Sequence, residues 1–110
     1  MKRKLALIMM LFCSGCAHVL LTVVNATDKP IKNVQIKMNK EVTVVSEMAA
    51  GEKHQQSLKV VAPIDINIDY EDLEGHQFYT SSPQSLKPGD GGSLSLSVTA
   101  VGTLEAVRIP

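Results

Sequence analysis

The stretch Ile64-Asp65-Ile66-Asn67-Ile68-Asp69-Tyr70 alternates four apolar side chains with three polar ones. Successive side chains of a β-strand point to opposite faces, so this period of two predicts a strand with one buried face and one solvated face. Residues 93–99 and 34–38 repeat the pattern. The three segments together indicate an all-β protein.

The remaining chain adds further short strands and bounds them with turn residues. Strands are expected at 20–24, 42–45, 56–61, 77–80 and 104–109, because apolar and β-branched residues gather there. The pair Asn39-Lys40 predicts a tight hairpin, since asparagine tolerates a positive φ. After residue 16 no segment has a helical period, and 48–50 has room for one helical turn at most.

Seven or eight short strands at this spacing predict a β-sandwich. The cysteine pair and core tryptophan of antibody domains are missing, because the chain has no Trp and both of its cysteines lie before residue 17. We therefore expect an immunoglobulin-like or a transthyretin-like sandwich, and the strand order stays open.

The first sixteen residues have the build of a secretory signal. A basic start at 1–4 precedes an apolar run at 5–12 and then Cys13-Ser14-Gly15-Cys16. The apolar run is too short to cross a membrane, which takes about 20 residues. The small pair before Cys16 resembles the lipobox of bacterial lipoproteins, although Cys13 stands where that family usually has leucine. The alternatives are a plain signal peptide, cut after Gly15 with Cys16 left as a free thiol, and a soluble chain with an apolar start.

This resemblance implies a cellular location and a modified residue. In bacterial lipoproteins the signal is removed before the cysteine, so residues 1–15 would be cleaved and Cys16 would carry the lipid. Ala17 is not the aspartate that retains such proteins at the inner membrane, which implies a lipid-anchored protein of the outer membrane that faces the periplasm. We then expect a short lipidated tether at 16–19 and a single sandwich domain at 20–110.

Composition narrows the possible partners of the mature chain. Loss of residues 1–15 removes three basic residues and leaves eight against eleven acidic ones, a net charge of −3. Such a domain is a poor ligand for phosphate backbones, which argues against nucleic acid. The mature chain keeps three aromatic residues, Tyr70, Phe78 and Tyr79. So few aromatics argue against a stacking platform or a small-molecule pocket.

The residues that carry chemistry do not form a catalytic pattern. His18, His54 and His76 are far apart in the sequence, unlike the close spacing of zinc ligands, and are expected as exposed residues at strand ends or turns. The densest acidic run does not match an EF-hand loop and is interpreted as a solvated strand face and turn, with a calcium site as the alternative. Its members are Asp65, Asp69, Glu71, Asp72 and Glu74. We expect no enzyme activity, no cofactor and no metal.

The leading functional hypothesis is a non-catalytic protein-interaction module, held at the membrane by lipid on Cys16, with a protein of the envelope as its partner. Exposed strand edges and the loops with Pro30 and Pro83–Pro88 are its candidate contact regions. One alternative is an accessory subunit of a secretion or envelope-assembly machine. Another is an inhibitor or immunity protein against an envelope-targeting hydrolase, which would use the loop at 81–92.

Overall fold

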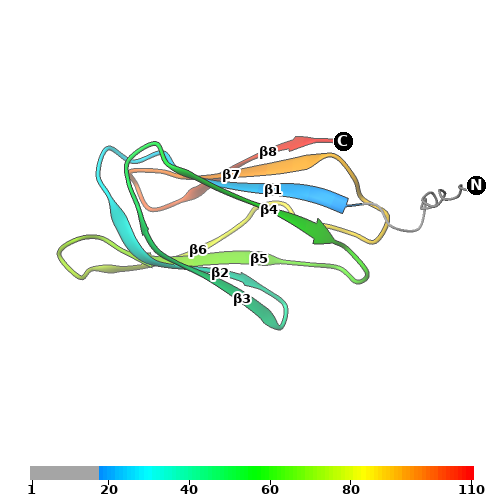
Figure 1. Cartoon of the computed structure of the whole chain (residues 1–110), viewed down its shortest axis with the longest axis horizontal. Helices are drawn as coiled ribbons and strands as arrows, with labels where there is room; N and C mark the ends of the chain where they lie inside the picture. Colours follow the sequence, from blue (N-terminus) through cyan, green and yellow to red (C-terminus); the bar gives the residue numbers. More distant parts are fainter. Residues whose placement is uncertain (1–17) are drawn as a thin grey trace, which may run out of the picture.

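Eight strands form two four-stranded sheets in a computed structural model of the chain, which describes residues 18–110 (Figure 1). The strands are β1 (His18–Asn25), β2 (Ile31–Met38), β3 (Glu41–Met48), β4 (Lys53–Lys59), β5 (Ile66–Glu71), β6 (Gln77–Ser81), β7 (Ser93–Val98) and β8 (Leu104–Ile109). The all-β sandwich expected from the sequence is confirmed. The expected signal segment at 1–15, the lipidation site Cys16 and the sorting residue Ala17 lie outside the described residues.

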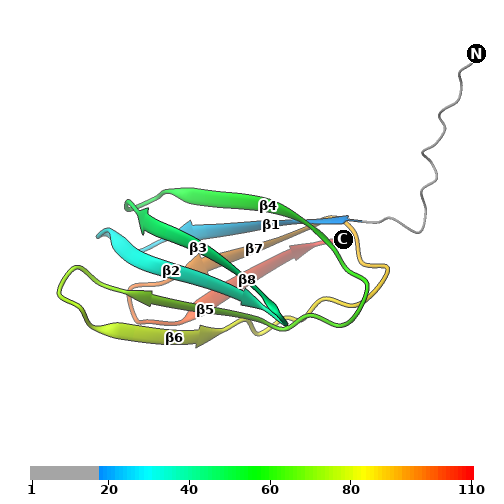
Figure 2. The same ribbon diagram turned by 60° about the horizontal axis from the view of Figure 1, so that its bottom comes forward.

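Strand order decides between the two sandwich types that the sequence left open. One sheet has the order β4-β1-β7-β8 and the other β3-β2-β5-β6, and the two sheets stack face to face (Figures 1 and 2). Immunoglobulin sandwiches keep their first two strands in one sheet. Here β1 and β2 lie in different sheets, and β1 pairs in parallel with β7. The immunoglobulin-like order is therefore wrong for this chain, and the transthyretin-like alternative remains.

The alternating stretch that predicted the fold supplies the middle of the core. Ile66, Ile68 and Tyr70 of β5 are buried, and the intervening Asn67 and Asp69 point outward. They join the inward side chains of both sheets in a core that is almost wholly aliphatic. Its main aromatic contact is Tyr70 stacked on Phe78, with ring centroids 5.0 Å apart. Removal of this apolar surface from water is what holds the sheets together.

Several strand boundaries differ from the sequence-based expectation. β1 begins at His18, and Val19 is fully buried, so residues 18 and 19 belong to the sandwich and not to the expected tether at 16–19. β4 begins at Lys53, three residues before the expected strand at 56–61, and ends at Lys59. The hairpin at Asn39 is confirmed, with a φ of 53° and with Met38 opposite Glu41.

The sandwich has two ends with different loops. The end where β1 starts, here called the N-terminal end, also carries the β2–β3 hairpin, the segment 60–65, the long connection 82–92 and the end of β8 (Figure 1). The opposite end carries the four short connections at 26–30, 49–52, 72–76 and 99–103. Within residues 18–110 no helix has the length and apolar character needed to cross a membrane.

Candidate interaction site

The edge strand β3 exposes apolar side chains at its centre. Its centre is the β-branched run Val42-Thr43-Val44-Val45, with neither proline nor lysine. Val42 and Val44 lie on the outer face and are 53% and 63% exposed. Natural edges are usually blocked by lysine, proline, charge or a bulge. Of the other three edges, β4 has a lysine at each end and β8 carries Glu105 and Arg108, while β6 is only five residues long.

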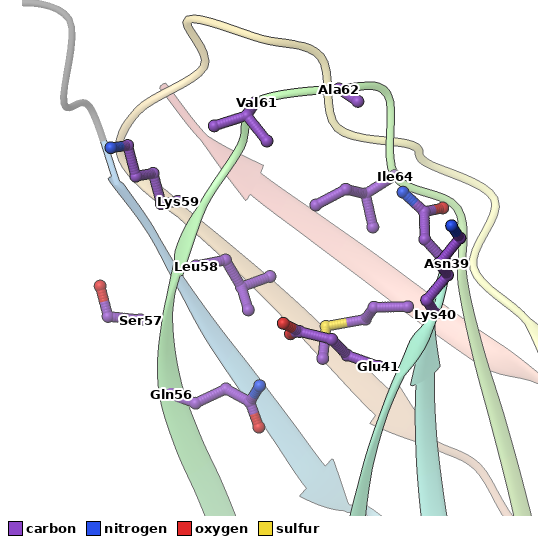
Figure 3. Close-up of a pocket in the computed structure, with 11 residues that line it drawn as sticks. Asn39, Lys40, Glu41, Gln56, Ser57, Leu58, Lys59, Val61, Ala62 and Ile64 are labelled. Carbon is purple, nitrogen blue, oxygen red and sulfur yellow. The ribbon is translucent and has the colours of Figure 1, made fainter.

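β3 and β4 are the edges of opposite sheets on the same side of the sandwich (Figure 2). A cleft of about 510 Å³ opens between them at the N-terminal end (Figure 3). Its floor is apolar, because Met38 and Leu58 are buried core residues and Ile64 packs against that core. Its rim is polar and includes Lys40, Glu41, Gln56 and Lys59. The two sheets therefore leave apolar core atoms accessible beside an open strand edge.

Alternation along β4 explains why side chains of this strand face the cleft. Gln56 and Leu58 are paired with the buried Leu21 and Val19 of β1, so they point inward, as Figure 3 shows. On the same face, Nε2 of His54 lies 3.0 Å from Oε1 of Gln56. His54 is the second residue of β4, which confirms the expected place at a strand end, but its ring is half-buried, which corrects the expectation of an exposed residue. The burial was missed because β4 starts earlier than its sequence suggested.

The acidic run at 65–74 does not converge on one site. Asp69 lies on the outer face of β5 and pairs with Lys37 of β2 at 2.6 Å. Oε2 of Glu71 accepts a hydrogen bond of 2.8 Å from Nδ2 of Asn33. Asp72 belongs to the β5–β6 hairpin instead, where its Oδ1 accepts hydrogen bonds from the backbone amides of Glu74 and His76. The carboxylates of β5 are therefore paired with side chains of β2, as expected of a strand face.

One cluster of possible metal ligands was not expected from the sequence. Asp72, Glu74 and His76 each offer one ligand atom, and these three atoms lie within 4.8 Å of one another. Nδ1 of His76 lies 2.9 Å from Oδ2 of Asp72 and 3.6 Å from Oε1 of Glu74. The hydrogen bond to Asp72 raises the pKa of His76 above its ordinary value of 6.5. The signal in the sequence was the i, i+2, i+4 spacing across the hairpin glycine Gly75.

We expect Asp72→Asn to lower the pKa of His76 toward its ordinary value, because the mutation removes the charge that stabilises the imidazolium. In the wild type, this contribution to stability is fully present below pH 6.5 and is lost as the pH rises through the raised pKa of the folded state. Its size is small because His76 is 68% exposed. An NMR titration of His76 in the wild type and in Asp72→Asn measures the shift. An unchanged His76 midpoint would contradict the role of Asp72.

Both proline-bearing loops are held to the sandwich. In the connection 82–92, Leu86 is fully buried, and its amide and carbonyl exchange 2.9 Å hydrogen bonds with Ile64. Asp90 in the same loop accepts a hydrogen bond from the amide of Lys87 and lies 3.8 Å from Arg108. The loop with Pro30 is fixed by the side chain of Asn25, whose Nδ2 donates to the carbonyl of Lys29. Neither loop therefore has the build of a free, protruding finger.

Comparison with known proteins supports the fold and gives no function. No family model matches this chain, and no curated protein matches it. An NMR structure of a protein from Eubacterium rectale is similar, with a TM-score of 0.57 and 12% sequence identity. The similarity covers 84% of this chain and 89% of that one. At this identity the likeness shows a shared β-sandwich fold alone.

Proposed function

We propose that this protein is a small lipid-anchored lipoprotein of the bacterial envelope that acts as a non-catalytic protein-interaction module. The anchor rests on the lipobox-type segment Cys13-Ser14-Gly15-Cys16, with Cys16 as the lipidated residue and Ala17 directing the protein to the outer membrane. The observation that carries the interaction is the unblocked centre of β3 beside the cleft.

The geometry favours binding by β-augmentation. An edge strand offers unpaired backbone N–H and C=O groups, and an extended segment of a partner can satisfy them by adding one strand to the sheet. Backbone hydrogen bonds supply affinity in this mode, and adjacent side-chain sites supply specificity. Here the cleft floor at Met38, Leu58 and Ile64 is the adjacent side-chain site.

The position of β1 supports a site close to the membrane, if Cys16 carries the lipid as proposed. β1 begins two residues after Cys16, and an extended residue spans at most about 3.6 Å. A tether from Cys16 to His18 can therefore span at most about 7 Å. Lys59, which lines the cleft, is paired with His18 in the sheet. The partner that this proposal requires is a membrane-proximal envelope protein.

In-cell crosslinking of the full-length protein, read by mass spectrometry, tests the proposal. We expect one abundant envelope partner that is lost both in Cys16→Ser, which removes the anchor, and in Val44→Lys, which places a charge on the open edge. Val107→Lys is the matched control, because Val107 is 60% exposed on the edge strand β8. Recovery of only bulk membrane proteins, equally with all four forms, would refute the interaction module.

A further inference from the structure

We infer that the N-terminal end of the sandwich is a docking surface for a lipid bilayer that carries anionic headgroups. This inference rests on the lipid anchor of the proposed function. It adds the surface that the domain turns toward the bilayer and the headgroup chemistry that this surface selects. It is carried by the loop at 60–65, by the unequal charge of the two ends and by the place where the chain enters the sandwich.

The connection between β4 and β5 presents apolar side chains at the N-terminal end. Residues 61–63 at its tip are exposed, and Val61 is 75% exposed (Figure 3). The loop is fixed to the β2–β3 hairpin, because Nδ2 of Asn39 donates a 3.0 Å hydrogen bond to the carbonyl of Pro63. Single exposed apolar residues are common, and at the opposite end Val101 is 82% exposed, so this loop does not by itself select the docking surface.

Charge distinguishes the two ends. The N-terminal end, taken as its loops and the strand residues next to them, carries Lys40, Lys59, Lys87 and Arg108 against Glu41, Asp65 and Asp90. The opposite end carries Lys29, Lys32 and Lys53 against Asp28, Glu47, Glu52, Glu71, Asp72, Glu74 and Glu105. With histidine counted as neutral, four against three is a net charge of +1, and three against seven is −4. An anionic bilayer attracts the first end and repels the second, so both effects turn the N-terminal end toward the headgroups.

Three lysines of this end are available to lipid phosphates. Lys40, Lys59 and Lys87 are exposed, and none of them takes part in an ion pair within residues 18–110. Arg108 differs from them, because it lies 3.8 Å from Asp90 and the two charges offset each other. A lysine can hold a headgroup phosphate while a neighbouring apolar side chain enters the membrane interface.

The anchor would hold the same end at the membrane. Lys59 is paired with His18, the first residue of β1, and Figure 3 shows the Lys59 amino group beside the start of that strand. With the lipid on Cys16, docking of this end is an intramolecular step, so a modest attraction is enough to fix one orientation. The centre of β3 stays uncovered, because that edge runs along the side of the sandwich between its two ends (Figure 2).

Spin-label accessibility in lipid nanodiscs tests this orientation. The lipidated protein, produced from the full-length chain, carries a nitroxide either at Ala62→Cys, beside Val61, or at Ala100→Cys, beside Val101; both alanines are exposed. In discs of equal parts phosphatidylglycerol and phosphatidylcholine, we expect collisions with a neutral, water-soluble nickel complex to be about fivefold rarer at position 62 than at position 100. In discs of phosphatidylcholine alone the two positions should be equally accessible.

Two charge variants test whether headgroup charge causes the protection at position 62. Lys40→Glu/Lys59→Glu should abolish it in the anionic discs. The matched control Lys29→Glu/Lys53→Glu should keep it, because these exposed lysines lie at the opposite end. Added salt should also lower the protection, since salt screens the attraction between lysines and the bilayer surface.

The outcomes separate this inference from the proposed function. Equal accessibility at positions 62 and 100 in anionic discs overturns the docking surface, even where the crosslinked partner of the wild type is lost in Val44→Lys. Protection that persists in neutral discs, or in Lys40→Glu/Lys59→Glu, rejects the anionic headgroup. Protection at position 100 instead of 62 would place the opposite end on the membrane, which also overturns the inference. A Cys16 that mass spectrometry finds without lipid would reject the anchor and this inference together.

Discussion

Gly92→Ala is expected to destabilise the domain by about 3 kcal/mol or more, the largest effect of adding a Cβ at any glycine within residues 18–110. Gly92 has a φ of +76°, a conformation that side chains other than glycine rarely adopt. An added Cβ would also overlap the carbonyl oxygen of Ile109 and lie 2.7 Å from the carbonyl carbon of Pro110. These are backbone atoms, so the end of β8 would have to move.

The position of Gly92 in the sheet increases this cost. Its carbonyl accepts a 3.0 Å hydrogen bond from the amide of Leu20, and Ser93 directly after it is paired with both Leu20 and Ile109. A displacement at residue 92 therefore disturbs β1, β7 and β8 together, at the end of the sandwich where β1 starts.

Thermal unfolding measured by circular dichroism checks this expectation, with a decrease in Tm of more than about 10 °C for a domain of this size. Gly91→Ala is the matched control. A Cβ at Gly91 meets no atom within 4 Å, and its φ is outside the glycine-only region, so its Tm should stay within a few degrees of the wild type. Equal Tm values for the two variants would show that the close approach to β8 does not exist in solution.

Asn25→Ala is expected to cost about 3 kcal/mol, because it leaves several buried backbone groups without a hydrogen-bond partner. Asn25 is fully buried at the end of β1. Its Nδ2 donates to the carbonyls of Lys29, Met48 and Ala49 at 2.8, 3.0 and 3.2 Å. Its Oδ1 accepts from the amide and the hydroxyl of Thr27 at 3.0 and 2.6 Å. One side chain thus ties the 26–30 loop to the β3–β4 connection.

Two further variants separate the hydrogen bonds of Asn25 from its packing. Asn25→Asp keeps the shape but places a carboxylate against three carbonyl oxygens, so we expect it to be at least as destabilising as alanine. Asn67→Ala, at an outward position of β5, should change stability by less than about 0.5 kcal/mol. Urea unfolding at pH 7 gives the three values. An Asn25→Asp variant as stable as the wild type would contradict the donor role assigned to Nδ2.

Asn25 also illustrates what local sequence patterns miss. In the sequence it lies next to a turn, where asparagine is common, so the local pattern calls for no further role. Only packing shows that its side chain is buried and bonded to residues 48 and 49, more than twenty positions away. His54 is a similar case, because the half-buried position of its ring follows from the pairing of β4 with the interior residues of β1.

The candidate site could be predicted only in part. The β-branched run in β3 is visible in the sequence. That β3 is an edge, and that its neighbour across the open side is β4, depends on which strands pair. Strand pairing is a choice among segments of similar local pattern, so the 510 Å³ cleft between these two edges had no signal in the sequence.

The sequence by itself determined that the chain is all-β, with seven or eight short strands close to their observed places, because alternation and turn residues act within a few positions along the chain. It also determined that the core is aliphatic, since almost no aromatic residues are present. Only the tertiary structure decided the order of the strands, the open edge at β3 and the burial of Asn25. These features arise from contacts between distant segments of the chain. The free energy of each such contact depends on which surfaces meet when the two sheets pack.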